Sequence, residues 1–418
     1  MDCCFYQTAI QGAEFSNGWI QEIKKLMTQS KSLRYSVLAN AASNLHFIES
    51  SGKFQELALT YYSKALRGLS DLLTRADQLE NHNSILMSMM LLYLHGCMGR
   101  GTYFDIPRHL NAATQVLALR LFKQTPTIGS PFDRLAVESV LYQIFLVTTG
   151  LWSDEEVNHR LDYDFDLDFW LRAERLLDQS RVFPGQSDSL NSPVLGVPAP
   201  LFRLALTLKQ MYQGAVSYDQ ANVGALRNEI EVWEGFVLCD KETDLLSDTE
   251  ERNHKHAYYR SASYLFILII SLLFEQLPRQ TSSSDEVTEL SPKTRAQPPS
   301  MVDPDSWQIR KAVQILKSYQ TDHEWASCFI GNWPVYTIGF FMRRPEHVQL
   351  TRSELQRRWT LTKFNQVARF CNDLEKTWAK RELIFPTEIE PLGRCWANFP
   401  PPPGTPGFDD VPHRKQGA

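Results

Sequence analysis

Apolar side chains recur at the spacing of an α-helix along much of this chain, and no segment shows the alternation typical of a β-strand. From Phe54 to Leu73 they fall three or four residues apart, so that they share one face of a helix. The segment from Asn83 to His95, which Gly96 follows, is apolar nearly all round, as a helix in the centre of a bundle is. The chain is therefore predicted to be all-α.

Two further helices are predicted over residues 109–122 and 135–149, the second ended by Gly150. Asp105-Ile106-Pro107 offers a capping carboxylate and an N-terminal proline to the first of them. Ser130 and Asp133 are expected to act in the same way for the second. Four helices joined by short loops indicate an antiparallel or solenoid-like array.

Helical patterns return after a stretch from Asp178 to Pro200 that is rich in Ser, Pro and Gly. The last of the predicted helices is preceded by Thr351-Arg352-Ser353-Glu354, which has the pattern of a capping box. The ranges predicted to be helical are 201–212, 225–237, 254–277, 307–319 and 355–383.

The most apolar run of the chain, from Ala262 to Phe274, favours a buried helix over a membrane span. It is 13 residues long and is bracketed by Arg260 and Glu275, whereas spanning a bilayer takes about 20 apolar residues. The N-terminal residues lack a basic segment followed by an apolar core, so no cleaved secretory signal is predicted. We expect no membrane partner.

The predicted helices and the polar segments between them suggest one helical domain interrupted by a linker. Residues 279–305 and the proline-rich end bury too little apolar surface to offset their ordering entropy. The predicted parts are an N-terminal segment 1–34, a helical domain 35–278, a flexible linker 279–305, a C-terminal helical part 306–396 of the same domain, and a disordered tail 397–418.

Composition narrows the function classes. The 418 residues include 43 Lys and Arg against 48 Asp and Glu, a formal net charge of -5, with 43% hydrophobic side chains. This is the balance of a folded, soluble protein, and it argues against a free-standing nucleic-acid binder, which normally has a basic excess. The seven cysteines are scattered without a C-x-x-C pair, which favours a reducing compartment.

No motif predicts catalysis or metal binding. His323-Glu324 begins like a zinc-protease helix, but Ser327 stands where the second histidine is needed. His254 and His256 point to different faces of a helix, so a solvated helix start is favoured over metal ligation. Gly99-Arg100-Gly101 follows a helix and not a strand, which makes it a helix-helix turn, not a dinucleotide loop. Hydrolase and NTPase signatures are missing from the sequence, so the chain is predicted not to be an enzyme, with no cofactor.

Alternating acids and apolar residues from Asp162 to Trp170 (DYDFDLDFW) permit two interpretations. A calcium loop needs glycine at its sixth position, where Leu167 stands, and glutamate at its twelfth, where Ala173 stands. Acids interleaved with aromatics also occur in transcriptional activation segments. The favoured interpretation is a loop that packs its rings on the bundle and leaves its carboxylates in water.

One local concentration of cations is found near the C-terminal end of the predicted domain. Phosphate binding is one interpretation, but Glu346 and Glu354 interrupt the cluster, and a solvated helix face is favoured. The cluster consists of Arg343, Arg344, His347, Arg352, Arg357 and Arg358, with Trp359 among them.

Several stretches together resemble the fungal-specific transcription factor domain, the regulatory middle region that follows a zinc binuclear cluster in those proteins. The order of the segments matches over about residues 35 to 385, most of the chain. The resemblance rests on residues 58–73 (ALTYYSKALRGLSDLL), 84–117, 192–212 (SPVLGVPAPLFRLALTLKQMY), 333–339 (WPVYTIG) and 373–378 (DLEKTW). It implies a nuclear location and control of a metabolic or secondary-metabolite gene set.

The six-cysteine zinc cluster of that family has no counterpart in the sequence. Cys3 and Cys4 are adjacent, and the next cysteine is Cys97. The usual DNA-reading module is therefore expected to be absent, either because the gene model is truncated or because the protein regulates through a partner. DNA contact is expected to be indirect or to come from a missing N-terminal segment.

Three function classes are compared. The favoured one is a transcription regulator that receives protein partners, with a homodimer and a small-molecule inducer left open. An alternative is a tetratricopeptide-like scaffold, since residues 58–66 would pass as one repeat helix, but no second copy recurs about 34 residues later. The third is an enzyme or sensor with an aromatic pocket, although such rings are more often core. The rings in question are Tyr61, Tyr62, Tyr93, Trp333 and Tyr336.

Overall fold

The computed structural model describes ten segments of the chain and three single residues between them. The segments are 13–49, 52–75, 83–98, 102–122, 131–152, 165–179, 194–212, 220–239, 250–277 and 302–381, and the single residues are Ile128, Tyr163 and Ser192. The predicted linker up to residue 301, the predicted tail, and Cys3 and Cys4 lie outside this part of the chain.

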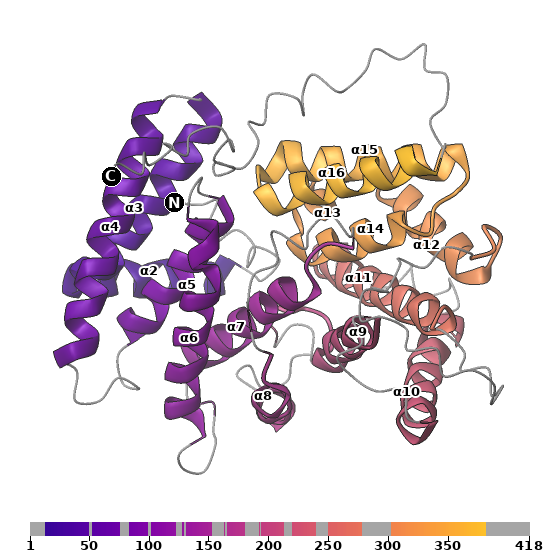
Figure 1. Cartoon of the computed structure of the whole chain (residues 1–418), viewed down its shortest axis with the longest axis horizontal. Coiled ribbons are helices and arrows are strands. Elements are labelled where there is room, and N and C mark those ends of the chain that lie inside the picture. The colour runs from indigo at the N-terminus through magenta and orange to yellow at the C-terminus, as the bar shows by residue number, and fades with distance from the viewer. Residues whose placement is uncertain are drawn as a thin grey trace, which may run out of the picture.

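The fold is all-α, as predicted: the described residues form fifteen α-helices and two 3-10 helices, with no strand among them. Figure 1 shows their arrangement. The α-helices are α2 (Ala13–Gln29), α3 (Lys31–Glu49), α4 (Gly52–Arg75), α5 (Asn83–Met98), α6 (Ile106–Leu121), α7 (Pro131–Thr149), α8 (Leu167–Gln179), α9 (Ala199–Tyr212), α10 (Gln220–Cys239), α11 (Glu250–Glu275), α12 (Trp307–Ser318), α13 (His323–Ser327), α14 (Asn332–Gly339), α15 (Pro345–Thr362) and α16 (Asn365–Lys380). The 3-10 helices are η3 (Tyr103–Asp105) and η6 (Phe329–Gly331).

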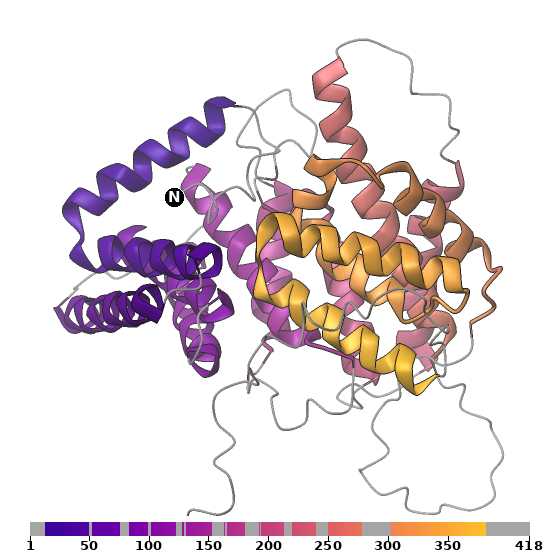
Figure 2. The ribbon, with the colours of Figure 1, turned by 90° about the horizontal axis from the view of Figure 1, so that it is seen from above.

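Two groups of helices lie on either side of α7. On one side α3 packs against α4 and α5, and α5 packs against α6. On the other side α11 packs against α9, α10, α12 and α14, and α15 packs against α16. Helix α7 contacts α5 and α6 of the first group, and it also contacts α8 and α9. It therefore joins the two groups, as Figures 1 and 2 show.

Helix α11 is the buried helix that the apolar run predicts. Ala257–Glu275 is long and apolar enough to cross a membrane by length and composition, but most of it is buried inside the protein. Leu265, Phe266 and Leu268 have no exposed surface. Such a pattern is typical of a central core helix, whose every face meets another helix.

The N-terminal boundary of the predicted domain is wrong. Residues 1–34 were expected to precede the helical body, yet α2 and the start of α3 belong to it, because Ile23, Leu26 and Leu33 are buried in the common core. The pattern of α3 is hard to recognise because small polar residues, among them Ser32 and Ser36, occupy part of its buried face. Their hydroxyls donate to backbone carbonyls, Ser32 to Ala65 of α4 and Ser36 to Ser32.

The single helix predicted over residues 355–383 is two helices, and the capping box before it is wrong. Helix α15 begins at Pro345, so Thr351 lies inside the helix, where its hydroxyl donates to the carbonyl of His347. Lys363 then adopts a left-handed conformation with φ 51° and ends α15. Helix α16 starts two residues later and packs back on α15.

Other boundaries differ in smaller ways. Gly96 does not end α5, which continues to Met98. Asp105 makes no capping hydrogen bond to α6, although Pro107 stands in the first turn as predicted. Helix α7 does end before Gly150, and Asp133 lies in its first turn. The predicted linker ends early, because Val302 is buried in the core.

Candidate functional site

The most extensive polar network in the described residues lies inside the C-terminal group of helices, where α13 and η6 meet α15. Glu354 and Arg358 stand one turn apart on α15 and face inward, and Arg358 Nε donates to Glu354 Oε1 at 2.8 Å. Arg357 forms a second ion pair with Glu354 Oε2. Both Arg358 and Glu354 are almost completely removed from water.

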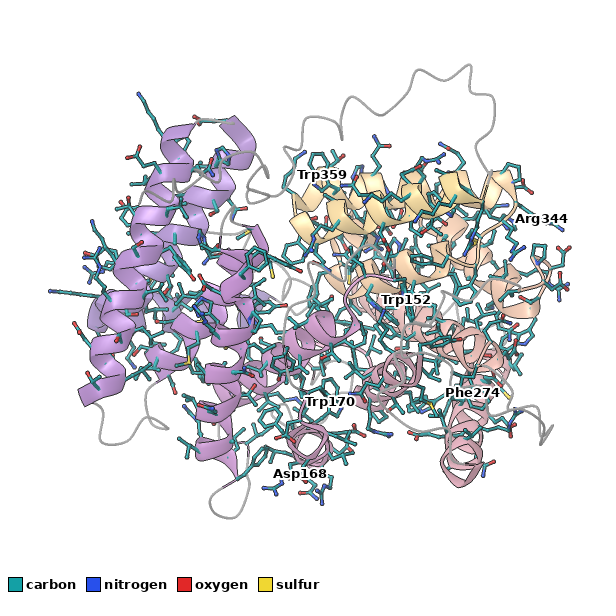
Figure 3. The ribbon with its side chains drawn as sticks, in the orientation of Figure 1. Trp152, Asp168, Trp170, Phe274, Arg344 and Trp359 are labelled. Atoms are coloured by element: carbon teal, nitrogen blue, oxygen red, sulfur yellow. The ribbon has the colours of Figure 1, made fainter. Side chains whose placement is uncertain are left out.

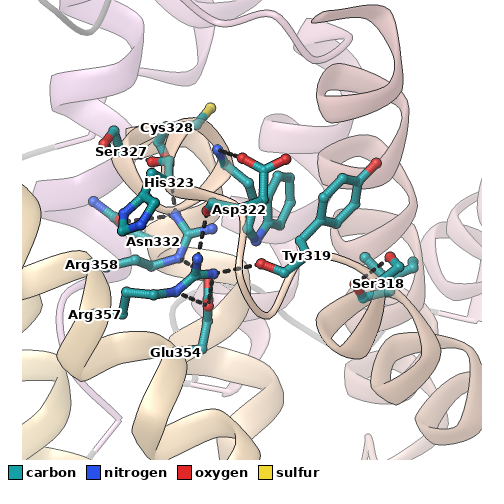
Figure 4. Close-up of polar contacts among 12 residues, drawn as sticks. Ser318, Tyr319, Asp322, His323, Ser327, Cys328, Asn332, Glu354, Arg357 and Arg358 are labelled. Carbon is teal, nitrogen blue, oxygen red and sulfur yellow. Dashed lines mark hydrogen bonds and ion pairs between the residues drawn. The ribbon is translucent and has the colours of Figure 1, made fainter. Parts of the chain in front are cut away.

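The two guanidinium groups hold the chain that runs from α12 to α14, as Figure 4 shows. Arg358 Nη1 donates to the Cys328 carbonyl at 2.7 Å and to Asn332 Oδ1 at 3.1 Å. Arg357 donates to the Tyr319 carbonyl at 2.7 Å and to the Asp322 carbonyl at 2.5 Å. One carboxylate carries only half of the charge needed to balance two guanidinium cations. The partially negative oxygens of the backbone carbonyls therefore accept the remaining hydrogen bonds.

Two further contacts fix the position of Arg358. Its guanidinium lies 4.9 Å from the centre of the Trp325 ring, which is a favourable cation-π distance. It also meets Gly331, where a Cβ would lie 2.7 Å from both Nη atoms. Only a residue without a side chain leaves room for the guanidinium there.

This arrangement is suited to positioning a loop and not to proton transfer. A guanidinium only donates hydrogen bonds and accepts none, so Arg357 and Arg358 act as fixed donors to the loop. Burial raises the pKa of the Cys328 thiol, which therefore stays protonated near neutral pH and is a poor nucleophile. The network stabilises the packing of α13 and η6 on α15.

A second buried network surrounds Glu138, in the middle of α7. Its Oε1 pairs with Arg134 Nε at 2.8 Å, and its Oε2 accepts hydrogen bonds from the Ser192 hydroxyl and from the Val194 and Leu195 amides at 2.8 to 3.0 Å. Burial raises the pKa of this carboxyl, and Arg134 acts in the opposite direction. The loop before α9 is thus anchored on α7.

The conformation of this loop depends on Gly196. Its φ of +60° is one that residues with a side chain rarely adopt, and a Cβ would lie 1.8 Å from the Tyr259 ring. The sequence showed this region only as a stretch rich in Ser, Pro and Gly. The missed signal was a single Arg134–Glu138 pair, one turn apart in a helix whose other residues are mostly apolar.

A third network joins segments that are far apart in the sequence. The Tyr336 hydroxyl donates to Asp373 Oδ2 at 2.5 Å and accepts from the Trp152 amide at 2.8 Å. Lys209 Nζ lies 3.8 Å from the centre of the Trp152 ring and donates to the Leu151 carbonyl. Trp152, labelled in Figure 3, therefore ties the end of α7 to α9, α14 and α16.

A fourth network lies between α4, α5 and α6. The Tyr62 hydroxyl donates to Asp105 Oδ2 at 2.9 Å, so the 2.8 Å contact with His109 requires His109 Nε2 to carry the hydrogen. His95 Nδ1 lies 3.0 Å from the Ser43 hydroxyl. Burial lowers the pKa of each histidine to about 4, so both are neutral near pH 7. This use of Asp105 explains why it does not cap α6.

The basic cluster predicted from the sequence is only partly a solvated face, which corrects that interpretation. Arg344 pairs with Asp305, and Arg352 pairs with Glu375 at 2.5 Å. Arg357 is half-buried and Arg358 completely buried, both on Glu354. Four of the five arginines are thus paired with carboxylates of the chain, with Arg357 and Arg358 sharing Glu354, which leaves little for phosphate.

The acid-aromatic segment is also different from the predicted loop, because Leu167–Gln179 is helix α8. Asp166 Oδ1 accepts from the Phe169 amide at 3.0 Å at the start of that helix. Trp170 is completely buried while Asp168 is exposed, so the expectation of packed rings and wet acids is correct for these residues. Asp162 and Asp164 lie outside the described residues.

Those of the remaining candidates that the structure describes do not assemble into a site. His323, Glu324 and Ser327 are exposed on the short helix α13, and the Ser327 hydroxyl donates to the His323 carbonyl. The side chains of His254 and His256 and the turn at residues 99–101 are outside the described part. Within that part, no group of three His, Cys, Asp or Glu side chains is placed to hold a metal ion.

The aromatic residues considered for a pocket lie in the packed interior. Tyr62, Tyr93, Trp333 and Tyr336 are buried, and Tyr61 is half-buried. Trp333 stacks on Phe266 of α11, and Tyr336 stacks on Phe370 of α16 with ring centres 4.0 Å apart. Their role in the described part of the chain is to fill the core.

Comparison with known proteins supplies the family. No curated protein and no solved structure matches the chain. One family model matches residues 3–385, nearly the whole chain, and its description is fungal specific transcription factor domain. That family is regulatory and not enzymatic. The described fold is all-α. Because the family model covers nearly the whole chain, the chain belongs to the fungal-specific transcription factor domain family.

Proposed function

We propose that this chain is a nuclear transcription regulator that controls a metabolic or secondary-metabolite gene set. The observation that carries the proposal is the family match over residues 3–385. The regulator acts through protein partners, either the transcription machinery or a DNA-binding regulator. Its own DNA contact is indirect, or comes from a segment outside these 418 residues, since Cys3 and Cys4 are not followed by another cysteine before Cys97.

The helical body supports a role as a partner platform. Buried ion pairs and hydrogen bonds hold the segments before α9 and around α13 and η6, so the surface that these segments present has one defined shape. A surface of fixed shape binds a partner with less ordering entropy to overcome than a flexible segment does.

The proposal is tested in the organism that carries the gene. A fluorescently tagged chain is expected to concentrate in the nucleus, and deletion of the gene is expected to change the transcripts of a defined gene set. Re-expression of the intact chain must restore those transcripts. Unchanged transcripts together with a non-nuclear signal contradict the proposal and favour a cytoplasmic scaffold.

A further inference from the structure

Two buried histidines lie where the α3–α4 hairpin meets the α5–α6 hairpin. His95 of α5 has no exposed surface, and His109 of α6 is 6% exposed. Both contact Tyr62 of α4. The Tyr62 ring stacks on that of His95 with the ring centres 4.8 Å apart, and the Tyr62 hydroxyl lies 2.8 Å from His109 Nε2. One tyrosine thus meets two side chains whose ordinary pKa lies near 6.5.

An added proton on His95 finds no hydrogen-bond acceptor. The Nδ1 atom lies 3.0 Å from the Ser43 hydroxyl of α3, whereas Nε2 is buried and has no hydrogen-bond partner among the described residues. An imidazolium carries a hydrogen on both nitrogens, so the charged ring would bury the Nε2 hydrogen unpaired, whichever tautomer the neutral ring adopts. Burying an unpaired N–H of a cation is strongly unfavourable. The packed interface therefore holds His95 in its neutral form.

The groups around the two histidines compensate little of an added charge. The carboxylate of Asp105 in η3 already accepts from the Tyr62 hydroxyl at 2.9 Å and from Arg108 of α6 at 3.2 Å. The groups that reach the pair from α3 and α4 are Ser43 and Tyr62, and neither is charged. Burial is the main cause that lowers the pKa of each histidine to about 4, and Asp105 opposes this effect for His109 without cancelling it.

The α3–α4 hairpin can separate without disturbing most of the protein. Within the described part of the chain, α3 and α4 pack on each other, on α2 and on α5, and neither makes an extensive contact with a helix from α7 onward. Figure 1 shows the two helices at the edge of the molecule, away from α9 to α16. A unit with few connections to the rest of a fold opens at a lower free energy than the whole fold does.

We propose that His95 and His109 form a proton-operated latch on Tyr62: while neutral they hold the α3–α4 hairpin on α5 and α6, and once protonated they let it separate while the helices from α7 onward stay folded. Protonation of buried histidines changes interfaces in this way in pH sensors. Separation uncovers the face of α5 that carries His95. The latch is a response of the fold to acid, and it does not rest on the proposed function.

Acid shifts the equilibrium toward the open hairpin. The open form exposes both histidines to water, where their pKa is the ordinary 6.5, whereas the pKa in the closed form is about 4. The open form therefore binds more protons in this interval, so the latch is fully effective above pH 6.5 and weakens below it. For two independent histidines, a fall from pH 7 to pH 5.5 raises the equilibrium constant of opening roughly 50-fold, and for one histidine roughly sevenfold.

Hydrogen exchange of the full-length chain at pH 7 and pH 5.5 tests the latch. The exchange is followed by mass spectrometry and corrected for the intrinsic pH dependence of amide exchange. A separated hairpin loses its protection, because isolated helices are marginally stable in water. We expect the opening constant of the amides in α3 and α4 to rise roughly 50-fold, while the amides of α11 and α15 keep their protection. Unchanged exchange in α3 and α4, or an equal loss of protection in α11 and α15, overturns the proposal.

Single substitutions assign the protons to the two histidines. H95Q and H109Q each leave one titrating histidine, so the ratio of the opening constants at pH 5.5 and pH 7 should fall to roughly sevenfold in each variant. H323Q, which removes an exposed histidine of α13, should keep the wild-type ratio. A full wild-type ratio in H95Q or in H109Q overturns the latch.

A general loss of stability does not imitate this result, because the ratio compares each chain with itself at two pH values. His95 is completely buried, so H95Q is the variant at greater risk of misfolding. If it does not fold, the wild type and H109Q decide by themselves: the wild type must show the rise confined to α3 and α4, and H109Q must reduce it.

Discussion

At the residue scale, the arginines of α15 show that the burial of a side chain can differ from what its neighbours in the sequence predict. Arg357 and Arg358 stand in a stretch of charged residues that resembles a solvated helix face. Arg358 is instead completely buried, because Glu354 one turn before it and the carbonyls of the preceding loop replace its hydration. Burying a charge is strongly unfavourable without such partners, and Nη2 of Arg358 still has no hydrogen-bond partner among the described residues.

Glu354→Gln is expected to destabilise the protein by about 3–5 kcal/mol, because it leaves Arg358 buried without a carboxylate. Urea unfolding followed by circular dichroism measures the loss. Arg108→Gln is the matched control: it removes an ion pair to Asp105 whose arginine is largely exposed, and should cost about 1 kcal/mol or less. Equal losses of unfolding free energy in the two variants would show that the buried ion pair contributes no more to stability than the exposed one.

Gly331→Ala tests the close approach of Arg358 to the backbone. The added Cβ would lie 2.7 Å from both Nη atoms, so the guanidinium must leave its hydrogen bonds to Cys328 and Asn332. We expect a destabilisation of about 1–3 kcal/mol, typical of overpacking.

Gly224→Ala in α10 is the control for that variant, because nothing lies within 4 Å of the added methyl group. It should stabilise the protein by up to about 1 kcal/mol through helix propensity. The midpoints of thermal unfolding of both variants distinguish a steric effect from a general effect of replacing glycine. A stabilising Gly331→Ala would contradict the described contact.

At the scale of elements, the helices whose sequence patterns were clear are those that bury one whole face or all faces. Helices α4, α5, α7 and α11 were expected near their observed positions for this reason. Helix α3 was missed because its interior face carries serines that hydrogen-bond to backbone carbonyls. The break between α15 and α16 was missed because Lys363, and not glycine, takes the left-handed conformation there.

The bundle of α3 to α6 is expected to lose stability as the pH falls from about 6.5 toward 4. In the folded chain the pKa of His95 and of His109 is about 4, below the ordinary value of 6.5. The unfolded chain therefore binds more protons in this interval, so the contribution of the neutral histidines is complete above pH 6.5 and decreases below it. The groups that face them are Ser43, Tyr62 and Asp105, with Arg108 nearby.

Urea unfolding at several values between pH 7 and pH 4.5 measures this dependence. The double variant H95Q/H109Q should be less stable than the wild type at pH 7 but should show a shallower decrease with acid. His323→Gln, at an exposed position on α13, should leave the slope unchanged. If the unfolding free energy of the double variant decreased with falling pH as steeply as that of the wild type, groups other than His95 and His109 would cause the acid sensitivity.

At the scale of the whole molecule, cohesion depends on contacts between residues that are far apart in the sequence. Trp152, at the end of α7, bonds through its amide to Tyr336 of α14 and to Asp373 of α16. Figure 2 shows α14 to α16 gathered on the side of the molecule away from α2 to α4. The C-terminal helices therefore complete the core that α7, α9 and α11 begin.

Tyr336→Phe is expected to destabilise the whole fold by about 1–3 kcal/mol, because Asp373 and the Trp152 amide each lose a buried hydrogen-bond partner. Denaturant unfolding followed by tryptophan fluorescence and by far-ultraviolet circular dichroism should shift together. Tyr35→Phe, at a half-buried ring stacked on Tyr61, should change stability by about 0.5 kcal/mol or less. Separated transitions would show that the two groups of helices unfold independently.

The sequence by itself determined the all-α class, the central buried helix α11 and the family, because helical periodicity and local motifs are properties of neighbouring residues. The tertiary structure alone decided which charged residues are buried and where α15 and α16 separate. Those features depend on partners such as Cys328, Ser192 and Asp373, which reach Arg358, Glu138 and Trp152 from distant positions in the chain. No local pattern records which distant residue will meet a given side chain, because that is fixed only when the helices pack.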